Sequence, residues 1–226
     1  MLRVSIIVPA LDEEREIETS LRSLRELAPA ELLVVDGGSS DATVAIARRF
    51  ADHVEITARG RARQLNAGAA RATGDVLCFV HVDTRLPNSA LGAVERALGD
   101  ATVVGGAFGI AIRDPRRRYR VIEWGANLRA RLTALPYGDQ AMFVRREVFA
   151  RLGGFPILPV LEDVGFALSM RRAGRVVLMD DRVANSPRRW EREGLFYATV
   201  RNWVITLLYA GGVPAERLAR WYPNVR

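Results

Sequence analysis

The chain has 226 residues, of which 49% are hydrophobic and 26% are charged. This balance is typical of a globular protein with a substantial core, and it excludes disordered and collagen-like classes. The formal net charge is +7 at pH 7, and the 33 basic residues are all arginines spread along the chain. Because they do not gather in one segment, we expect no nucleic-acid partner, although a modest positive field favours small anionic ligands such as phosphates.

The cysteine content and the first residues indicate the compartment. Cys78 is the one cysteine and lies in an apolar stretch, so no internal disulfide can form, which fits a reducing cytoplasm. The opening MLRVSIIVPA lacks the charged leader, apolar core and cleavage site of an export signal. No apolar run approaches the roughly 20 residues that span a bilayer. We therefore expect a cytoplasmic protein.

The first half of the chain alternates short apolar, β-branched runs with helical patterns. This alternation predicts an α/β fold with an open, twisted, mostly parallel sheet flanked by helices. We expect strands at 4–10, 32–36, 53–57 and 75–83. Helices are expected to begin near Asp12, near Ser40 or Asp41, at Arg61 and near Pro87. The loops after the strands then lie at the carboxyl edge of the sheet, where such folds bind ligands.

The second half has a more mixed pattern. We expect strands at 103–112 and 141–146, a charged loop at 113–120, and helices at 119–134 and 162–172. A last helix carries apolar side chains at helical spacing: Phe196, Val200, Trp203, Val204, Leu207 and Leu208.

Several common α/β activities lack their motifs in this chain. The residues after the first expected strand read PALDEERE, where a dinucleotide-binding enzyme needs G-x-G-x-x-G. A phosphate loop ending in G-K-[ST] is impossible without lysine. The sequence also contains no G-x-S-x-G, no H-E-x-x-H and no paired-cysteine zinc pattern.

Carboxylates remain at the ends of successive expected strands. Asp12 and Glu13 follow the first strand, Asp36 ends the second, and Asp83 ends the fourth. Each one alone fits a helix cap or a turn as well as a ligand site. Because parallel strands end at the same edge of a sheet, their joint position predicts a ligand site there.

These motifs, in this order, resemble the family 2 glycosyltransferases, which have the GT-A fold, over nearly the whole chain. SIIVPALDEE is similar to the family's opening strand and acidic turn, with Asp12 where asparagine is more usual. VVDGGSSDAT resembles the second-strand motif whose aspartate contacts the nucleotide base, here Asp36. GRARQLNAGAARATGDVLCFVHVDT is similar to the stretch that leads into a metal-binding D-x-D motif.

The resemblance continues in the second half. GDQAMFVRREVFARLGGF is similar to the acceptor-side segment, and LEDVGFALSMRRAG to the E-D motif that holds the catalytic base. The RRW that begins at Arg188 resembles the basic-aromatic tail of some members. More narrowly, GRARQLNAG, HVDTRLP, GDQ and RRWEREG together resemble the arsenosugar-biosynthesis type of these enzymes.

The resemblance implies an inverting glycosyltransferase that moves a sugar from a nucleoside diphosphate sugar to a hydroxyl of a small-molecule or lipid-linked acceptor. It implies one domain over residues 1–226, with a nucleotide-binding half (1–100) and an acceptor half with C-terminal helices (101–226). Mn²⁺ or Mg²⁺ would neutralise the leaving diphosphate. Two alternatives stay open: a non-catalytic nucleotide-sugar-binding protein, and a nucleotidyltransferase, which needs a glycine-rich basic loop after the first strand.

The metal site departs from the family pattern at His81. Asp83 is the expected ligand, and His81 replaces the family's first aspartate. An imidazole binds Mn²⁺ but suits Mg²⁺ poorly, and it can instead donate a hydrogen bond to ribose or phosphate. If the strand continues to Asp83, His81 and Asp83 share one face and Val82 points the other way.

The remaining donor contacts are expected from residues 9–13, from Asp36 and from residues 59–64. Arg59, Arg61 and Gln64 flank a helix start, where N–H groups and guanidinium forks hold phosphate, with solvated surface side chains as the alternative. The full expected nucleotide-sugar set is Pro9, Ala10, Asp12, Glu13, Asp36, Arg59, Arg61, Gln64, His81, Val82 and Asp83.

The expected chemistry needs a general base for the acceptor hydroxyl. Asp163 is the expected base, Glu162 its partner or an acceptor contact, and Asp139 the competitor; capping of a helix is the structural alternative for the first two. Arg188 and Arg189 are expected to neutralise the diphosphate, and Trp190 to stack on the acceptor sugar or to have a structural role. The expected acceptor and diphosphate set is Gly138, Gln140, Arg188, Arg189 and Trp190.

Two features predict contacts beyond the active site. The arginine run from Arg113 to Arg120 and the apolar C-terminal helix together fit peripheral contact with the anionic inner face of a membrane. A homodimer through the helix is an alternative. A solvated loop and a helix packed on its own domain are the others.

Overall fold

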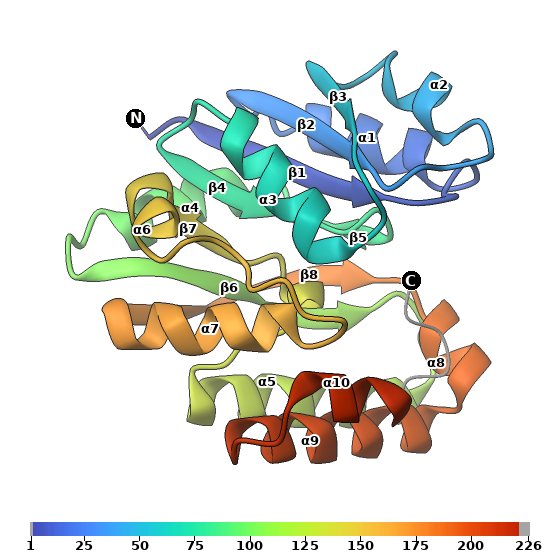
Figure 1. Cartoon of the computed structure of the whole chain (residues 1–226), viewed down its shortest axis with the longest axis vertical. Helices are drawn as coiled ribbons and strands as arrows, with labels where there is room; N and C mark the ends of the chain where they lie inside the picture. The colour runs from blue at the N-terminus through green and yellow to red at the C-terminus, as the bar shows by residue number, and fades with distance from the viewer. Residues whose placement is uncertain (1, 222–226) are drawn as a thin grey trace.

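A mixed, eight-stranded sheet flanked by helices organises the computed structural model of the chain (Figure 1). The structure describes residues 2–221, apart from the side chain of Arg189. In that part of the chain the strand order is β3-β2-β1-β4-β7-β6-β8-β5. Its helices are each too short or too polar to cross a bilayer.

The first four strands form the expected parallel unit. They are β1 (Val4–Ala10), β2 (Glu31–Asp36), β3 (His53–Ile56) and β4 (Val76–Phe79). All residues of β2 and β4 are buried, as expected for strands covered on both faces. The helices between them are α1 (Ile17–Arg25), α2 (Thr43–Ala47) and α3 (Arg61–Arg71).

The second half adds antiparallel neighbours to this unit. Its strands are β5 (Thr84–Arg85), β6 (Val103–Ile112), β7 (Phe143–Arg145) and β8 (Arg175–Asn185). β7 pairs antiparallel with β4 and β6, β6 pairs parallel with β8, and β5 pairs antiparallel with β8. The sheet is therefore parallel in its first half and mixed beyond β4.

Helices cover both faces of the sheet and form a further layer in the second half (Figure 1). They are α4 (Ala90–Leu98), α5 (Arg117–Thr133), α6 (Arg146–Arg151), α7 (Glu162–Ala173), α8 (Arg188–Glu193), α9 (Leu195–Ala210) and α10 (Ala215–Leu218), with short 3-10 helices η1 (Gly138–Gln140) and η2 (Ala219–Trp221). The expected helices over 119–134 and 162–172 are confirmed as α5 and α7. The expected charged loop at 113–120 is partly wrong, because α5 already begins at Arg117.

Strand alternation divides the core between the two sheet faces. On β1, Ile6 and Val8 join one buried cluster and Ile7 joins the other. Cys78 belongs to the first cluster, and burial raises the pKa of its thiol to about 12. The cysteine is therefore an inert core residue, not a reactive thiol.

The strands β8 and β4 also differ from expectation. β8 was not expected, since its sequence RVVLMDDRVAN has no regular alternation; pairing with β6 and β5 makes it a strand. β4 was expected to reach Asp83 but ends at Phe79, and a turn follows in which Thr84 N–H donates to His81 O at 3.1 Å. The expectation that His81 and Asp83 share one face of the strand is therefore wrong, because neither residue lies in the strand.

The glycines of β6 permit close packing at the centre of the sheet. A methyl group on Gly106 would lie 2.7 Å from Val177 Cγ2 and 2.8 Å from Phe143 Cζ. Both neighbours are parts of packed strands, so neither can move away easily. The segment VVGGAFGIAI is thus a central buried strand whose glycines admit its neighbours.

We expect Gly106→Ala to lower the free energy of unfolding by about 3 kcal/mol, because the added methyl overpacks the sheet. Gly92→Ala is the matched control, since a methyl there lies on an α-helix, 3.4 Å from the mobile end of Arg96. That change should be neutral or stabilise by up to about 1 kcal/mol. Urea unfolding measures both, and equal effects would contradict the packing explanation.

Candidate functional site

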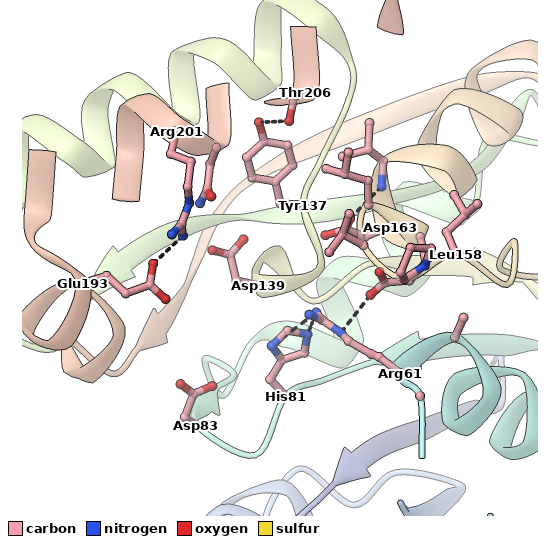
Figure 2. Close-up of a pocket in the computed structure, with 18 of the residues that line it drawn as sticks. Arg61, His81, Asp83, Tyr137, Asp139, Leu158, Asp163, Glu193, Arg201 and Thr206 are labelled. Atoms are coloured by element: carbon pink, nitrogen blue, oxygen red, sulfur yellow. Dashed lines mark hydrogen bonds and ion pairs between the residues drawn. The ribbon is translucent and has the colours of Figure 1, made fainter. Parts of the chain in front are cut away.

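A cavity of about 1060 Å³ lies beyond the carboxyl end of β4, between the amino-terminal ends of α3 and α7 and the helix α9 (Figure 2). Side chains from both halves of the chain line it. Ten of the residues expected from the sequence line it: Glu13, Arg59, Arg61, His81, Asp83, Asp139, Glu162, Asp163, Arg188 and Trp190.

The turn after β4 places the two residues of the altered metal motif in this cavity. His81 and Asp83 both line it, whereas Val82 is buried in the core between them. The side chain of Thr84 anchors the end of the turn through a 2.8 Å hydrogen bond to Asn185 Oδ1. The turn therefore brings His81 and Asp83 to the same cavity and directs Val82 away from it, as strand alternation was expected to do. Val82 can affect a ligand only through its packing.

Arg61 joins this turn to the start of α7. Its Nε lies 3.2 Å from Glu162 Oε1, and its Nη2 contacts the imidazole nitrogens of His81. Figure 2 shows the contact of the Arg61 guanidinium with His81. Because Arg61 is the first residue of α3, three separate segments meet at one side chain.

Glu162 and Asp163 occupy the first turn of α7. Leu161, just before them, has a left-handed backbone with φ of 64°, a conformation that is strained for leucine and turns the helix start sharply. Burial raises the pKa of Glu162, the charge of Arg61 opposes this shift, and the charge of Asp163 adds to it. Glu162 is thus a desolvated carboxylate that depends on Arg61 for its charge balance.

The carboxylate of Asp163 is held by two main-chain donors. Gly138 N–H donates to Oδ2 at 2.7 Å, and Val164 N–H donates to Oδ1 at 2.8 Å. The second bond is a local contact with the next residue and is not a helix cap, since α7 has no side-chain cap. The first is a long-range bond that ties α7 to η1. Asp163 therefore lines the cavity in a fixed orientation.

Gly138 fits this position because it has no side chain. A methyl group there would meet Arg61 Nη2 and would lie 3.2 Å from both His81 Nε2 and Asp163 Oδ2. The residue after it, Asp139, lines the cavity, and its main-chain carbonyl accepts a bond of 2.9 Å from Asn185 Nδ2. The glycine in the Gly-Asp-Gln triplet is therefore explained by the approach of Arg61.

Arginines surround Asp83. Burial raises the pKa of its carboxyl group, and the charges of Arg188, Arg61 and Arg113 oppose that shift. Arg113 Nη2 also donates to the main-chain oxygen of Asp83 at 3.1 Å. These guanidinium groups come from distant parts of the chain, and together they make this wall of the cavity suitable for an anionic group such as a diphosphate.

Asp12, after β1, and Asp36, at the end of β2, hold turns at the sheet edge and do not line this cavity, whereas Glu13 does. Asp36 Oδ2 accepts the N–H groups of Gly38 and Ser39 at 2.8 and 2.7 Å. Asp12 Oδ1 accepts the N–H of Ser40 at 2.8 Å. The expected helix start near Asp12 is wrong, because α1 begins at Ile17 and its first turn has no side-chain cap.

Pro9 and Ala10 end β1 beside these turns, with Ala10 in register with Asp36. Gln64 fixes this edge, because its Nε2 donates to Ala10 O at 2.8 Å and to Val35 O at 2.9 Å. The buried amide of Gln64 is thereby committed to main-chain carbonyls, so the structure gives it a positioning role for the strand ends.

Gln140 has a similar structural position under η1. Its Nε2 donates to Phe108 O at 3.0 Å, and its Oε1 accepts from Tyr137 N–H at 3.0 Å. The side chain is buried. Of the Gly-Asp-Gln triplet, Asp139 thus faces the cavity, while Gly138 and Gln140 set its backbone.

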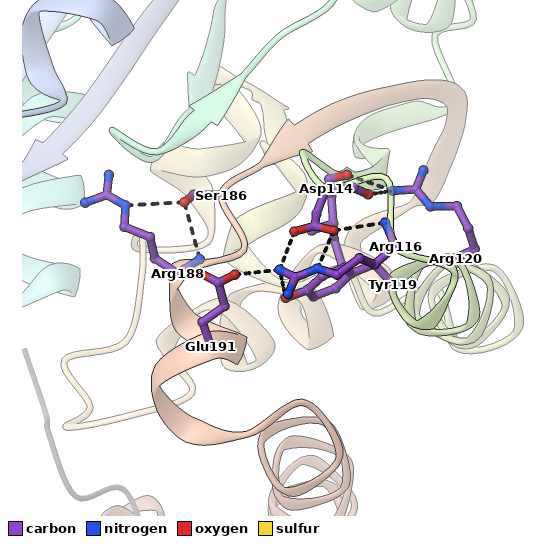
Figure 3. Close-up of polar contacts among 8 residues, drawn as sticks. Asp114, Arg116, Tyr119, Arg120, Ser186, Arg188 and Glu191 are labelled. Carbon is purple, nitrogen blue, oxygen red and sulfur yellow. Dashed lines mark hydrogen bonds and ion pairs between the residues drawn. The ribbon is translucent and has the colours of Figure 1, made fainter.

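The basic-aromatic segment packs against the start of α5 (Figure 3). The ring of Trp190 lies edge-on to Tyr119 with centroids 6.4 Å apart, and Trp190 also lines the cavity. Arg188 forms an ion pair of 2.7 Å with Glu16. The side chain of Arg189 lies outside the part of the chain that the structure describes.

Part of the arginine run serves this packing. Arg116 binds Asp114 and lies 2.6 Å from Glu191, and the Arg116 contact holds the pKa of Asp114 at about 2. Arg120 lies 2.9 Å from the buried Glu123. Both arginines are ion-pair partners, and Arg116 connects α8 to the segment just before α5, which differs from a solvated loop.

Sequence reasoning missed several cavity residues. Tyr137 donates to or accepts from Thr206 Oγ1 at 2.7 Å, and the Arg129 guanidinium lies 3.6 Å from the Tyr137 ring centroid. Arg201 is buried in the cavity wall, where it pairs with Glu193. A signal existed for Arg201 alone, because it is the one charged residue in the apolar stretch from 195 to 210.

The donor groups of the cavity limit the kind of metal site that it can form. Among the side chains that the structure describes, no three or more His, Cys, Asp or Glu residues are grouped to hold a metal ion. Asp83 presents a carboxylate to the cavity, and His81 is in contact with Arg61. These residues fit a cation that takes most of its oxygens from a bound substrate, not a closed protein site.

Comparison with known proteins identifies relatives of the chain. The family model described as Glycosyl transferase family 2 matches residues 5–153. A PGL/p-HBAD biosynthesis glycosyltransferase from Mycobacterium bovis is 30% identical, with 72% of this chain and 67% of that protein covered. The probable glycosyltransferase YdaM from Bacillus subtilis is 24% identical, with 76% of this chain covered; the chain spans about half, 47%, of YdaM's length.

Solved structures share the fold. The mannosyltransferase PcManGT from Pyrobaculum calidifontis, in complex with GDP-Man and Mn²⁺, has a TM-score of 0.68 and 24% identity, with 91% of this chain and 60% of that chain covered. Glucosyl-3-phosphoglycerate synthase from Mycobacterium tuberculosis, in complex with Mn²⁺, UDP and glucosyl-3-phosphoglycerate, has a TM-score of 0.67 and 21% identity, with 94% and 81% covered. The expected GT-A fold is confirmed.

The pKa shift of Glu162 predicts a pH-dependent stability effect. A carboxyl group whose pKa rises on folding weakens the folded state as the pH increases from the ordinary value of 4.5 through the raised one. Glu162→Gln removes this effect. We therefore expect the variant to gain stability relative to the wild type between about pH 4 and about pH 7.

Urea unfolding at the two pH values measures this difference. Glu147→Gln, which changes an exposed carboxylate on α6, is the matched control and should show no comparable pH dependence. A loss of stability in Glu162→Gln that is larger at pH 7 than at pH 4 would mean that attraction to Arg61 outweighs desolvation.

Proposed function

The chain belongs to glycosyltransferase family 2, and from this premise we propose that it transfers a sugar from a nucleoside diphosphate sugar to an acceptor hydroxyl with inversion at the anomeric carbon. The observation that carries the proposal is the pairing of functions in one cavity. Asp163 presents an oriented carboxylate on one side, and the arginines around Asp83 provide positive charge on the other. A base and an anion site are the two parts that such a transfer requires.

In this proposal residues 1–100 bind the nucleotide and residues 101–226 bind the acceptor, within one domain. The sheet edge formed by Pro9, Ala10, Asp12 and Asp36 receives the nucleoside, and Glu13 and Arg59 line the cavity beside it. GDP-Man and UDP are the nucleotides in the two related structures described above. For Gln64 and Val82 we propose indirect roles, because both side chains are buried away from the cavity.

The leaving diphosphate is proposed to lie against Arg61 and Arg188, with Arg189 nearby in the sequence. Mn²⁺ or Mg²⁺, when bound, would neutralise the growing charge on the diphosphate. Asp83 is the residue that would hold the ion, together with substrate oxygens. Mn²⁺ is present in both related complexes. The imidazole of His81 contacts Arg61, so we propose that it orients this guanidinium toward the phosphates, with metal ligation as its alternative role.

Asp163 is proposed to take the proton of the acceptor hydroxyl as that oxygen attacks the anomeric carbon. Its two main-chain hydrogen bonds hold the carboxylate in place without a flexible partner. Glu162 keeps Arg61 in position, and Asp139 on the facing turn remains the competing base. Trp190 has one part against Tyr119 and one part in the cavity, which suits a sugar-stacking surface.

Two alternative functions have fewer observations in their favour. A non-catalytic nucleotide-sugar-binding protein is favoured only by the replacement at His81. A nucleotidyltransferase is disfavoured by the acidic PALDEE loop, which lacks the basic, glycine-rich character that this activity needs. We keep the arsenosugar type and a cytoplasmic location as proposals: the four sequence motifs support the first, and the single cysteine, Cys78, fits the reducing environment of the second.

Asp163→Asn is expected to lower turnover about 10²- to 10⁴-fold, because it removes the base while its amide keeps a similar shape. Donor binding should be retained. A thermal-shift screen with UDP, GDP, CDP and dTDP in the presence of Mn²⁺ identifies the donor base, since a ligand of the folded state raises the unfolding temperature. Turnover is then measured with the matching nucleotide sugars.

Glu147→Gln, outside the cavity, is the control for general effects of losing a carboxylate. If Asp163→Asn keeps its turnover and Asp139→Asn loses it, the base is Asp139. If a broad donor panel gives neither binding nor turnover with the wild type, the proposed activity is wrong.

His81→Asp is expected to raise Mg²⁺-supported turnover relative to Mn²⁺-supported turnover by at least about tenfold if the side chain at this position lies at the metal. Mg²⁺ prefers oxygen ligands, and the change restores one. The measurement is turnover of both proteins across a titration of each ion. An unchanged ratio of the two activities would place His81 outside the metal site and leave it as a partner of Arg61.

A further inference from the structure

Helix α9 exposes an entirely apolar face. Its exposed side chains are Phe196, Tyr197, Val200, Trp203, Val204, Leu207 and Ala210. Phe196 and Leu207 are the most accessible, at 79% and 72% exposure. The one charged residue of the helix, Arg201, is buried and faces the cavity. The helix thus turns its charge inward and its apolar side chains outward, the reverse of an ordinary surface helix.

Helix α5 exposes only apolar side chains and arginines. The apolar ones are Val121, Trp124, Leu128 and Leu132, and the arginines are Arg117, Arg118, Arg120 and Arg131. Its one carboxylate, Glu123, is buried against Arg120. Among the described residues, the exposed surface of this helix therefore carries positive charge and no negative charge.

The two apolar faces are neighbours. A methyl group placed on Gly125 of α5 would lie 3.4 Å from the ring of Trp203 on α9. Figure 1 shows both helices in the layer farthest from β1 to β3. We call the ten large apolar side chains of α5 and α9 together, without Ala210, the α5–α9 surface. An apolar group of this size, exposed and rimmed by basic residues, marks an interaction site more often than an ordinary surface.

We propose that the α5–α9 surface binds an anionic lipid bilayer at its headgroup level. Tyr197, Trp124 and Trp203 are the side chains that suit this level, since each combines a large apolar ring with a polar group. Arg117 and Arg118, at the start of α5, provide attraction to anionic headgroups. The chain's net charge of +7 acts in the same direction.

A second copy of the chain complements this surface less well. A symmetric pair would bring the arginines of two α5 helices toward each other. Neither α5 nor α9 offers an exposed carboxylate to match them among the described residues. An anionic bilayer satisfies both the apolar and the basic part of the surface.

Binding in this way would place the cavity beside the bilayer. Tyr197, Arg201, Asn202 and Thr206 line the cavity from the same helix α9 that carries the exposed face. If the proposed transfer activity is correct, an acceptor held in the bilayer would reach Asp163 along this helix. Vesicle binding itself does not depend on that activity and is measured without any substrate.

The experiment is flotation of the full chain with vesicles of neutral phosphatidylcholine, and with vesicles in which roughly a third of the lipid is phosphatidylglycerol. We expect binding to the anionic vesicles that weakens as NaCl is raised to about 0.5 M, because salt screens the arginines. The triple variant Leu132→Ser, Phe196→Ser, Leu207→Ser should bind at least about tenfold more weakly, because it loses apolar area at the lipid.

Matched variants separate the two contributions. Arg117→Gln with Arg118→Gln should lose binding to anionic vesicles, whereas Arg48→Gln with Arg71→Gln removes two exposed arginines elsewhere and should not. Ile56→Ser, an exposed apolar change on β3, controls for the triple variant. Unchanged circular dichroism and thermal unfolding, measured first, establish that each variant is folded.

The proposal is overturned if the folded wild type does not float with anionic vesicles, or if the triple variant floats as well as the wild type. It is also overturned if sedimentation shows a dimer that the triple variant abolishes while vesicle binding is absent; the surface then belongs to a second copy. Vesicle binding without any sugar transfer would support this inference and count against the proposed activity alone.

Discussion

The contact of the Arg61 guanidinium with His81 and Glu162 is the constraint on which the cavity depends. It joins the first residue of α3, the turn after β4 and the first turn of α7. The crowding around it accounts for Gly138, and its charge opposes the rise in the pKa of Glu162 that burial causes. The guanidinium of Arg61 therefore connects the two halves of the chain at the place where a reaction between two bound substrates would occur.

The polar residues of the site divide into those that hold the backbone and those that face a ligand. Asp36, Gln64 and Gln140 are buried, and their oxygens and amides bind main-chain groups. Buried polar groups need such partners, so these side chains stabilise the strand ends and η1. His81 and Asp83 face the cavity. There, desolvation raises the pKa of Asp83 and the nearby arginines oppose this rise. The residues that hold the backbone thus keep the cavity-facing residues in place.

The second half of the chain combines a cavity wall with an outward apolar surface on one helix. Arg201 and Thr206 of α9 face inward, whereas Phe196 and Leu207 of the same helix face solvent. The ion pairs of Arg116 connect α8 to the segment between β6 and α5. Any partner of the outer face therefore acts close to the cavity.

Local sequence patterns predicted the parallel unit from β1 to β4, the helices α5 and α7, and ten of the residues that line the cavity. Local periodicity and strand-end carboxylates carry that information, because each depends on neighbours in the chain. Three other features appear only in the folded chain: β8 is a strand, the chain turns at His81, and Arg61 contacts both His81 and Glu162. These outcomes depend on contacts between residues far apart in the sequence, which no local pattern records.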